Sequence, residues 1–196
     1  MKLKTIYLKN FRCYKDEVRI EFDDLTTFVG KNDIGKSTIL EALEIFFNND
    51  LVKIEPSDAN IHGDNNVVIT CDFCDLPSEL ILDSGEITNL ADEYLTISND
   101  TLRIKKVYDC SKSKVPSTVY IVANHPNVVE AKDLLSLKEK ELQKIIKDKG
   151  IDGPLKGNPL MRKAIWASIE DLHLQVTEIE VSKAKEDGKE MWTKID

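Results

Sequence analysis

The chain has 196 residues, of which 41% are hydrophobic and 32% charged, and this apolar content excludes a globally disordered protein. Its 27 Lys and Arg against 35 Asp and Glu give a formal net charge of −8, which argues against a chain that mainly coats nucleic acid. No apolar run approaches the roughly 20 residues of a membrane span, and the charged N-terminus is unlike a signal peptide, so we expect a cytoplasmic protein.

The first part of the chain predicts strands and then a helix. Residues 2–11 and 17–22 read as strands, and in the second of them apolar and charged residues alternate. Residues 25–29 form a short uncharged run, which predicts a strand buried on both faces. From Gly35 the apolar residues recur every three or four positions, which predicts a helix that stops near 48–50.

The second part predicts further strands and then helices. Three segments are typical of antiparallel strands: 67–74, 101–109 and 117–123. A helical piece is expected around 86–95, and helical spacing returns from Val128, with a helix that ends at Gly150 and another over about 159–172. In 173–196 the apolar spacing also fits a heptad seam, but we favour a short strand followed by a helix from about residue 183.

The cysteine spacing leaves two interpretations. Four cysteines, at 13, 71, 74 and 110, are too few for a disulfide scaffold. Cys71 and Cys74 have the C-x-x-C spacing of zinc ligands, but a structural zinc site needs four ligands and no second pair follows. We therefore favour buried thiols, with a metal site as the alternative.

Residues 30–38 match the phosphate-loop pattern G-x-x-x-x-G-K-[ST] in full, between an apolar run and a helix. Backbone N–H groups of such a loop wrap the phosphates of a nucleotide, and the helix N-terminus adds its unpaired donors. The ammonium of Lys36, the expected catalytic group, would lie between the β- and γ-phosphates, and the Ser37 hydroxyl would bind Mg²⁺. The residues expected to hold ATP are Gly30, Asn32, Asp33, Ile34, Gly35, Lys36, Ser37 and Thr38.

The first 47 residues resemble the N-terminus of ABC-type chromosome and DNA-repair ATPases, the SMC-like, RecF-like and OLD (overcoming lysogenization defect) group. The resemblance rests on the L-x-N-F-R sequence from Leu8 to Arg12, the second strand, and a phosphate loop about thirty residues into the chain. The run from Asn32 to Lys36 looks most like OLD-type ATPases, several of which belong to anti-phage systems.

The resemblance implies an α/β fold of the P-loop NTPase class, the N-terminal lobe of an ABC-type ATPase. It implies an ATP-binding lobe with an antiparallel β-subdomain over 1–127, and a helical segment over 128–196 that leads into sequence not present in this chain. Two such heads would form a homodimer around two ATP molecules, and the full-length protein would act on DNA and not on a membrane. Arg12 should approach the phosphates, and the loop from Ser57 to Ile61 would flank the adenine.

The sequence departs from this group in two respects. The group binds Mg²⁺ through a Gln after the β-subdomain, but Gln143 and Gln175 both lie in later runs. We hypothesise that Asn124 or His125 replaces it as a metal ligand. Both lie in a predicted turn over 120–126, and the alternative is that this turn holds no metal ligand. Walker B, signature and switch-His sequences do not occur, so we expect a piece of a longer protein that hydrolyses ATP slowly or not at all.

Two alternatives stay open from the sequence. A self-contained small P-loop kinase or GTPase could use Asp72, which follows an apolar run, as its Walker B residue. A nucleotide-binding module could instead regulate a partner without turnover.

Overall fold

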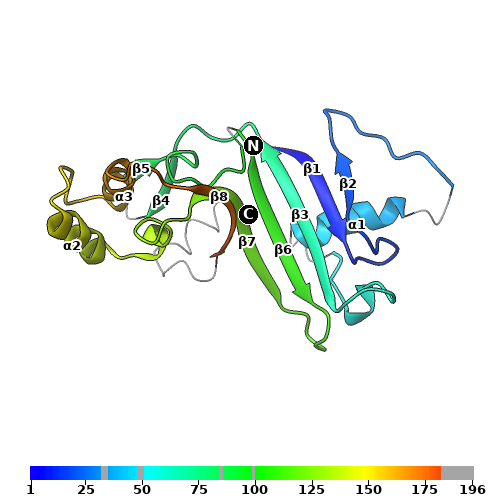
Figure 1. Ribbon diagram of the computed structural model, residues 1–196. Coiled ribbons are helices and arrows are strands. Elements are labelled where there is room, and N and C mark those ends of the chain that lie inside the picture. Colours follow the sequence, from blue (N-terminus) through cyan, green and yellow to red (C-terminus); the bar gives the residue numbers. More distant parts are fainter. Residues whose placement is uncertain (32–34, 48–50, 84–85, 99, 182–196) are drawn as a thin grey trace. The chain divides into compact units, whose positions relative to one another are not determined.

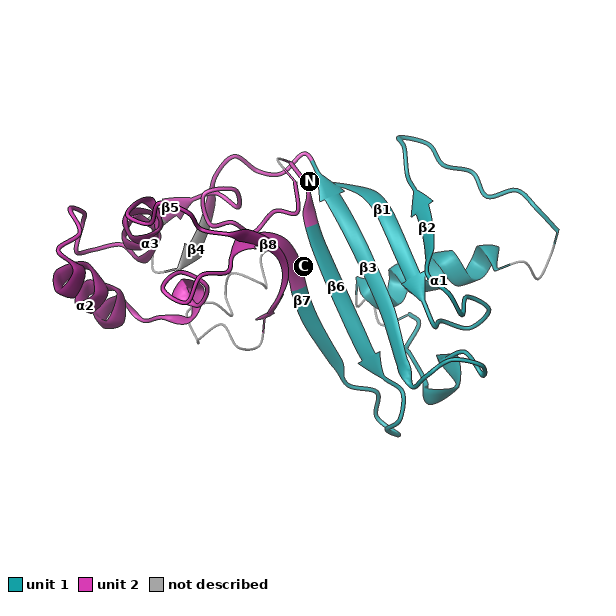
Figure 2. Cartoon of the chain, viewed as in Figure 1, with its two compact units in different colours: residues 1–74, 103–120 teal, residues 75–102, 121–196 magenta. Residues whose placement is uncertain are grey.

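The computed structural model describes residues 1–31, 35–47, 51–83, 86–98 and 100–181 (Figure 1). The chain divides into two compact units, unit 1 with residues 1–74 and 103–120, and unit 2 with residues 75–102 and 121–196 (Figure 2). This division differs from the predicted boundary after residue 127, because the segment 75–102 groups with the C-terminal residues.

The described residues form a six-stranded sheet in the order β2-β1-β3-β6-β7-β8, and a hairpin of β4 and β5. The strands are β1 (Lys2–Lys9), β2 (Val18–Glu21), β3 (Asn66–Cys74), β4 (Leu80–Asp83), β5 (Glu86–Thr88), β6 (Leu102–Asp109), β7 (Ser117–Pro126) and β8 (Leu174–Glu180). Strand β1 pairs antiparallel with β2 and with β3. The strands predicted at 2–11, 17–22, 67–74, 101–109 and 117–123 are confirmed, but β7 continues to Pro126 through the residues predicted as a turn.

Helix α1 (Lys36–Phe46) packs on one face of the sheet in unit 1, as the spacing of its apolar residues predicts. The Phe46 and Phe47 rings lie 6.3 and 6.2 Å from the ring of Phe73 in β3. Lys106 of β6 is buried and its Nζ donates a hydrogen bond to the Phe46 carbonyl at 2.7 Å. A cation at the carbonyl end of a helix is favourable, so this lysine anchors the end of α1 on the sheet.

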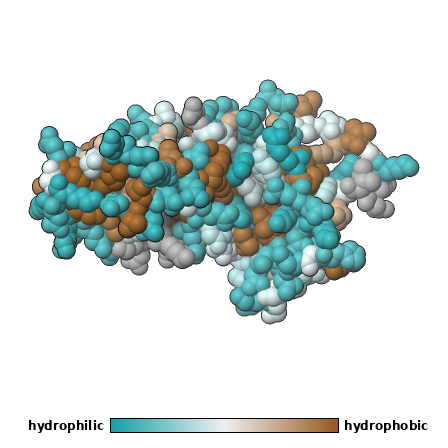
Figure 3. All heavy atoms as spheres, in the orientation of Figure 1, coloured by the Kyte–Doolittle hydropathy of each residue, from teal (hydrophilic) through white to brown (hydrophobic). Residues whose placement is uncertain are grey.

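The strand predicted at 25–29 is wrong, since none of these residues is in a strand. Leu25 and Val29 are 86% and 87% exposed, and hydrophobic residues reach the surface of unit 1 in the space-filling view (Figure 3). A strand needs a neighbour for its backbone N–H and C=O groups, and β2 is the last strand at this end of the described sheet. An apolar run alone does not supply that neighbour.

The helix predicted around 86–95 is also wrong. Strand β5 pairs with β4, and a turn follows over residues 90–94. The Asn89 side chain accepts a hydrogen bond from the Asp92 backbone N–H at 2.7 Å, and Tyr94 has a positive φ of 53°. Asn side chains that capture nearby N–H groups favour turns over helices.

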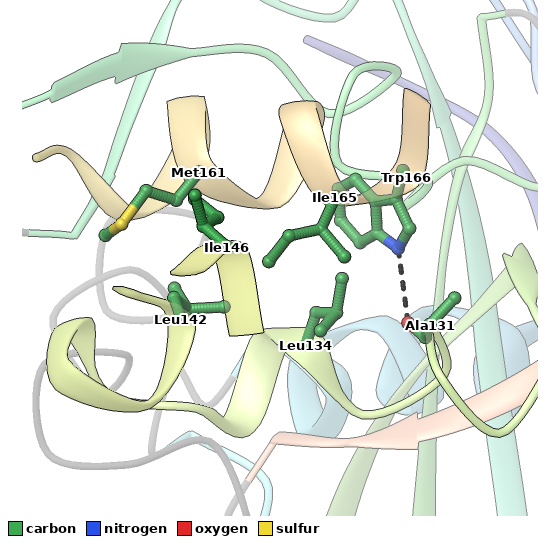
Figure 4. Close-up of a cluster of buried hydrophobic side chains, with 7 residues drawn as sticks. All are labelled: Ala131, Leu134, Leu142, Ile146, Met161, Ile165 and Trp166. Carbon is green, nitrogen blue, oxygen red and sulfur yellow. Dashed lines mark hydrogen bonds between the residues drawn. The ribbon is translucent and has the colours of Figure 1, made fainter. Parts of the chain in front are cut away.

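Unit 2 is built around α2 (Glu139–Lys149) and α3 (Asn158–Ala167). The predicted helix from Val128 is a turn and the short 3₁₀ helix η2 (Leu134–Ser136) before α2, which ends at Gly150 as expected. The buried apolar cluster between these elements (Figure 4) comprises Ala131, Leu134, Leu142, Ile146, Met161, Ile165 and Trp166. The strand predicted within 173–196 is β8, and the helix predicted from about residue 183 lies outside the described residues.

Candidate functional site

Gly35 is the point at which the phosphate loop becomes a helix. It is the N-cap of α1 and has the left-handed φ of 90°, a conformation that glycine adopts without strain. A Cβ atom at position 35 would lie 2.7 Å from the Tyr14 Oη and 2.8 Å from the Cys13 Sγ. The second glycine of the motif is thus favoured by its conformation, and any side chain there would displace Tyr14 and Cys13.

The N-terminus of α1 offers donors for an anion. No side chain of the described residues caps it, and its first turn holds no acidic residue, so the backbone N–H groups there have no side-chain acceptor among the residues that the structure describes. Ser37 is exposed in this first turn, and Thr38 is buried. Asn32, Asp33 and Ile34, the other expected phosphate ligands, lie outside the described residues.

The Lys36 ammonium folds back over the start of the phosphate loop. Its Nζ donates a hydrogen bond to the Gly30 carbonyl at 2.8 Å and another to the Lys31 carbonyl. These acceptors are neutral, so a phosphate group would be a stronger partner for the same ammonium. The structure therefore brings the Lys36 ammonium to the Gly30 end of the loop, and the ATP-binding role of these residues stays a prediction.

The tight turn from Phe11 to Tyr14 contacts this loop. Two backbone hydrogen bonds of 2.9 Å close the turn, and the Tyr14 hydroxyl donates to the Gly35 carbonyl at 3.2 Å. Arg12 has a positive φ of 49°, which is rare for a side chain of this size and is held by its backbone N–H bond to the Asp58 carbonyl at 2.7 Å. Strained residues of this kind cluster at functional sites.

The Arg12 side chain has two carboxylate partners, which the sequence did not indicate. Its Nε donates to Asp58 Oδ1 at 2.7 Å, its Nη1 donates to Glu41 Oε2, and its guanidinium lies 5.0 Å from the centre of the Phe11 ring. Burial acts against the charged form, but the bonds to Asp58 and Glu41 outweigh it and raise the pKa of Arg12 above its ordinary value. The structure thus places Arg12 beside the phosphate-loop helix, with its charge already paired.

The loop expected to flank adenine supports the Arg12 turn. The 3₁₀ helix η1 (Pro56–Asp58) leads into it, and the side chain of Asn60 donates to the Arg12 carbonyl. Asp58 is buried, whereas Ile61 is 88% exposed. The proposed role of this loop beside adenine stays a prediction.

Asn124 and His125, the candidate metal ligands, lie within β7 and in unit 2. The Asn124 amide donates to the Ile97 carbonyl at 2.7 Å, and His125 Nδ1–H donates to the Tyr94 carbonyl at 3.0 Å. Within the described ranges no three His, Cys, Asp or Glu side chains are grouped to hold a metal ion. The metal role of these two residues stays a prediction.

Cys71 and Asp72 are neighbours in β3 with different surroundings. The Cys71 thiol is buried, as expected, and burial strongly raises its pKa. Asp72 accepts two hydrogen bonds from Arg103, at 2.6 and 2.8 Å, and one from the Tyr7 hydroxyl at 3.2 Å. Successive strand residues point to opposite faces, so Asp72 points away from the face on which Phe73 meets α1. This geometry argues against Asp72 as a Walker B residue beside Ser37.

Comparison with known proteins identifies a family and several partial relatives. A family model described as AAA ATPase domain matches residues 1–196. The chain is 48% identical over 44 residues to the Chromosome partition protein Smc of Halobacteriovorax marinus, which covers 22% of this chain and 4% of that protein. It is 34% identical over 118 residues to the Structural maintenance of chromosomes protein 3 homolog of Plasmodium falciparum, which covers 59% of this chain and 9% of that protein.

A third relative is the DNA replication and repair protein RecF of Lactococcus lactis subsp. lactis, with 52% identity over 44 residues, 22% of this chain and 12% of that protein. The chain thus spans no more than 12% of the length of these three relatives. None of the helices in the described part of the chain has the length and apolar character needed to cross a membrane.

Proposed function

This chain belongs to the family of AAA ATPase domains, and from that premise we propose that it binds ATP with Mg²⁺ at residues 30–38 as one part of an SMC- and RecF-like ATPase. The observation that carries the proposal is the N-terminus of α1, which no described side chain caps and which begins at Gly35, with the Lys36 ammonium bonded to the start of the loop. An anion at this position gains both backbone N–H donors and an ammonium group.

The chain's own groups fit the chemistry of a Mg²⁺-triphosphate. Lys36 would exchange the Gly30 carbonyl for β- and γ-phosphate oxygens, and Arg12 would approach them from the turn at Phe11 to Tyr14. The exposed Ser37 hydroxyl is a hard oxygen donor, as Mg²⁺ prefers. When bound, the metal ion would neutralise charge that develops on the phosphates.

We propose further that this chain alone hydrolyses ATP slowly or not at all. Hydrolysis needs a group that orients or deprotonates the attacking water. Asp72, the residue that follows the apolar run of β3, is already bound by Arg103 and Tyr7. The remaining catalytic groups would come from further sequence and from a second, paired head.

The names of the relatives, chromosome partition and DNA replication and repair, support ATP-gated action on DNA by the whole protein. The Asn32-Asp33-Ile34 sequence of the phosphate loop favours the OLD-type branch, and with it anti-phage defence or a nuclease domain, within this proposal. A regulatory module that binds nucleotide without turnover is the second candidate, and the bonded state of Asp72 favours it over a self-contained kinase or GTPase.

The test is a titration with a fluorescent ATP analogue in the presence of Mg²⁺. Lys36→Ala should weaken binding at least tenfold, because a charge-assisted hydrogen bond contributes about 1.5–3 kcal/mol. Lys140→Ala, which removes an exposed lysine from α2, is the matched control and should bind as the wild type does. Undiminished binding by Lys36→Ala, with a folded circular dichroism spectrum, would overturn the proposal.

Turnover separates the remaining candidates. We expect phosphate release by the wild-type chain to be slow, and Asp72→Asn to leave it slow. Rapid turnover that Asp72→Asn abolishes would instead identify a self-contained enzyme.

A further inference from the structure

The two carboxylates that bind Arg12 carry together more negative charge than its guanidinium carries positive charge. One guanidinium faces Asp58 and Glu41, which gives the three side chains a net charge of −1. Hydrogen bonds to carboxylates engage Nε and Nη1, and no hydrogen bond to Nη2 is found among the described residues. A triphosphate that approaches this group therefore meets a cation whose charge is already compensated.

The two carboxylates are held very differently. The Asp58 side chain is 12% exposed, and its second oxygen, Oδ2, accepts a hydrogen bond from the Glu55 backbone N–H at 2.8 Å. Its backbone carbonyl also binds the Arg12 N–H, so Asp58 is tied to the turn by main chain and side chain. Glu41 is 35% exposed and, in the part of the chain that the structure describes, its carboxylate bonds only to Arg12.

The position of Glu41 connects this asymmetry with the nucleotide site. Glu41 lies on α1, five residues after Lys36, and the Arg12 turn contacts Gly35 through the Tyr14 hydroxyl. The Arg12–Glu41 bond therefore joins the turn to the same helix whose N-terminus faces the phosphates. It can be broken without loss of the Arg12–Asp58 bond.

From these contacts we propose that Glu41 is an electrostatic latch, a positioning residue that holds Arg12 when no nucleotide is bound and gives it up to the triphosphate of ATP. Asp58 is the fixed anchor that keeps Arg12 in the turn in both states. The proposal rests on ATP binding at residues 30–38, as proposed above.

The physical basis is competition for one set of donors. A guanidinium presents N–H groups in a planar fork that fits either a carboxylate or a phosphate. Carboxylate and phosphate repel each other, so Glu41 and ATP cannot both keep the same edge of Arg12 at low cost. The apparent affinity for ATP falls as the fraction of molecules with a closed latch rises.

The two acids therefore have opposite predicted effects. Glu41→Gln opens the latch and should raise the affinity for ATP by up to about fivefold, since a partly exposed ion pair is worth at most about 1 kcal/mol. Asp58→Asn frees Arg12 from its anchor and should lower the affinity by about tenfold. Glu44→Gln, which makes the same charge change three residues further along α1, is the matched control and should have little effect.

A double-mutant cycle with Arg12→Ala separates a latch from general repulsion. Without the guanidinium, Glu41→Gln should no longer raise the affinity, whereas a gain from reduced repulsion would persist. Circular dichroism and thermal unfolding of each variant establish that it folds. Equal loss of affinity in Glu41→Gln and Asp58→Asn, or a gain that survives Arg12→Ala, would overturn the latch. Failure of the wild-type protein to bind ATP would instead overturn the proposed function.

Discussion

Gly35 shows how one residue type can be required for two reasons at once. Its φ of 90° disfavours any side chain, and the side chains of Tyr14 and Cys13 would have to shift to admit one. Gly150, at the end of α2, also has a positive φ, of 63°, but a Cβ atom there would meet nothing within 4 Å. A comparison of substitutions at Gly35 and Gly150 therefore separates the effect of a strained φ from the effect of steric overlap with neighbouring side chains.

We predict that Gly35→Ala both destabilises the protein and weakens ATP binding, because Tyr14 and the loop must move. Gly150→Ala should cost only the strain of a left-handed residue, about 1 kcal/mol, and leave ATP binding unchanged. Urea unfolding and the analogue titration measure the two effects. Equal behaviour of both variants in the titration would show that the contact with Tyr14 and Cys13 is unimportant.

His125 is a buried base whose titration should appear in stability. Burial lowers its pKa, while the carbonyls of Tyr94 and Lys132 and the charge of Asp133 act in the opposite direction. The unfolded chain takes up the proton near pH 6.5, and the folded chain does so only at lower pH. The stability from neutral His125 is thus present above pH 6.5 and is lost as the pH falls toward its lowered folded pKa.

We therefore predict that the difference in unfolding free energy between wild type and His125→Gln shrinks as the pH falls from about 7.5 to 5. Urea unfolding at a series of pH values measures this difference. A difference that grows toward low pH would mean that the folded state binds the proton more tightly than the unfolded state does.

At the scale of elements, a buried ion pair joins the turn over 90–94 to α3. Arg162 Nε and Nη2 donate to Glu93 at 2.7 and 3.0 Å, and both side chains are at most 2% exposed. Thr88 of β5 also donates to Glu93, at 3.1 Å. The hairpin and the helix are thus connected through charged groups that water does not reach.

We predict that Arg162→Met costs about 3–5 kcal/mol, because it leaves the Glu93 carboxylate buried without its cation. Arg162→Met combined with Glu93→Met should recover much of this loss, since no charge then remains buried. Urea unfolding followed by Trp166 fluorescence, in a Trp192→Phe background, reports on this unit. A double variant no more stable than the single one would contradict the explanation.

The sequence predicted those elements whose pattern is local. Strand β2 and helix α1 follow from alternation and three-to-four spacing, and the phosphate loop follows from glycine and lysine positions. The run at 25–29 failed because strand formation depends on a neighbour that local pattern does not show. Glu41 and Asp58 were missed because they meet Arg12 from 29 and 46 residues away, and a single sequence carries no signal for such contacts.

At the scale of the whole molecule, the candidate functional residues are divided unevenly between the two units, which the net charge of −8 does not reveal. The phosphate loop, the Arg12 turn and the carboxylates that hold it all belong to unit 1. The candidate metal ligands Asn124 and His125 belong to unit 2, where their side chains bind backbone carbonyls. The described residues that we propose to bind the nucleotide therefore lie in unit 1.

One thiol-modification experiment tests the burial of all four cysteines of the chain. Cys13 is exposed, Cys74 is half-buried with its Sγ 3.7 Å from the Lys2 carbonyl, and Cys71 and Cys110 are buried. Burial raises the pKa of both buried thiols, and only the thiolate reacts with a disulfide reagent. We predict that the native protein shows one fast thiol with such a reagent near pH 8, and that Cys13→Ser abolishes this phase.

Mg²⁺-ATP should slow the modification of Cys13, because its Sγ lies against Gly35, where the bound phosphates would restrict access of the reagent. Lys36→Ala is the control that keeps Cys13 exposed but should lose this protection. Reaction of all four thiols after unfolding in urea calibrates the amplitude. A fast phase that persists in Cys13→Ser would contradict the assigned burial. A rate unaffected by saturating ATP would mean that the nucleotide does not reach the Gly35–Cys13 contact, and so would separate the Arg12 turn from the nucleotide site.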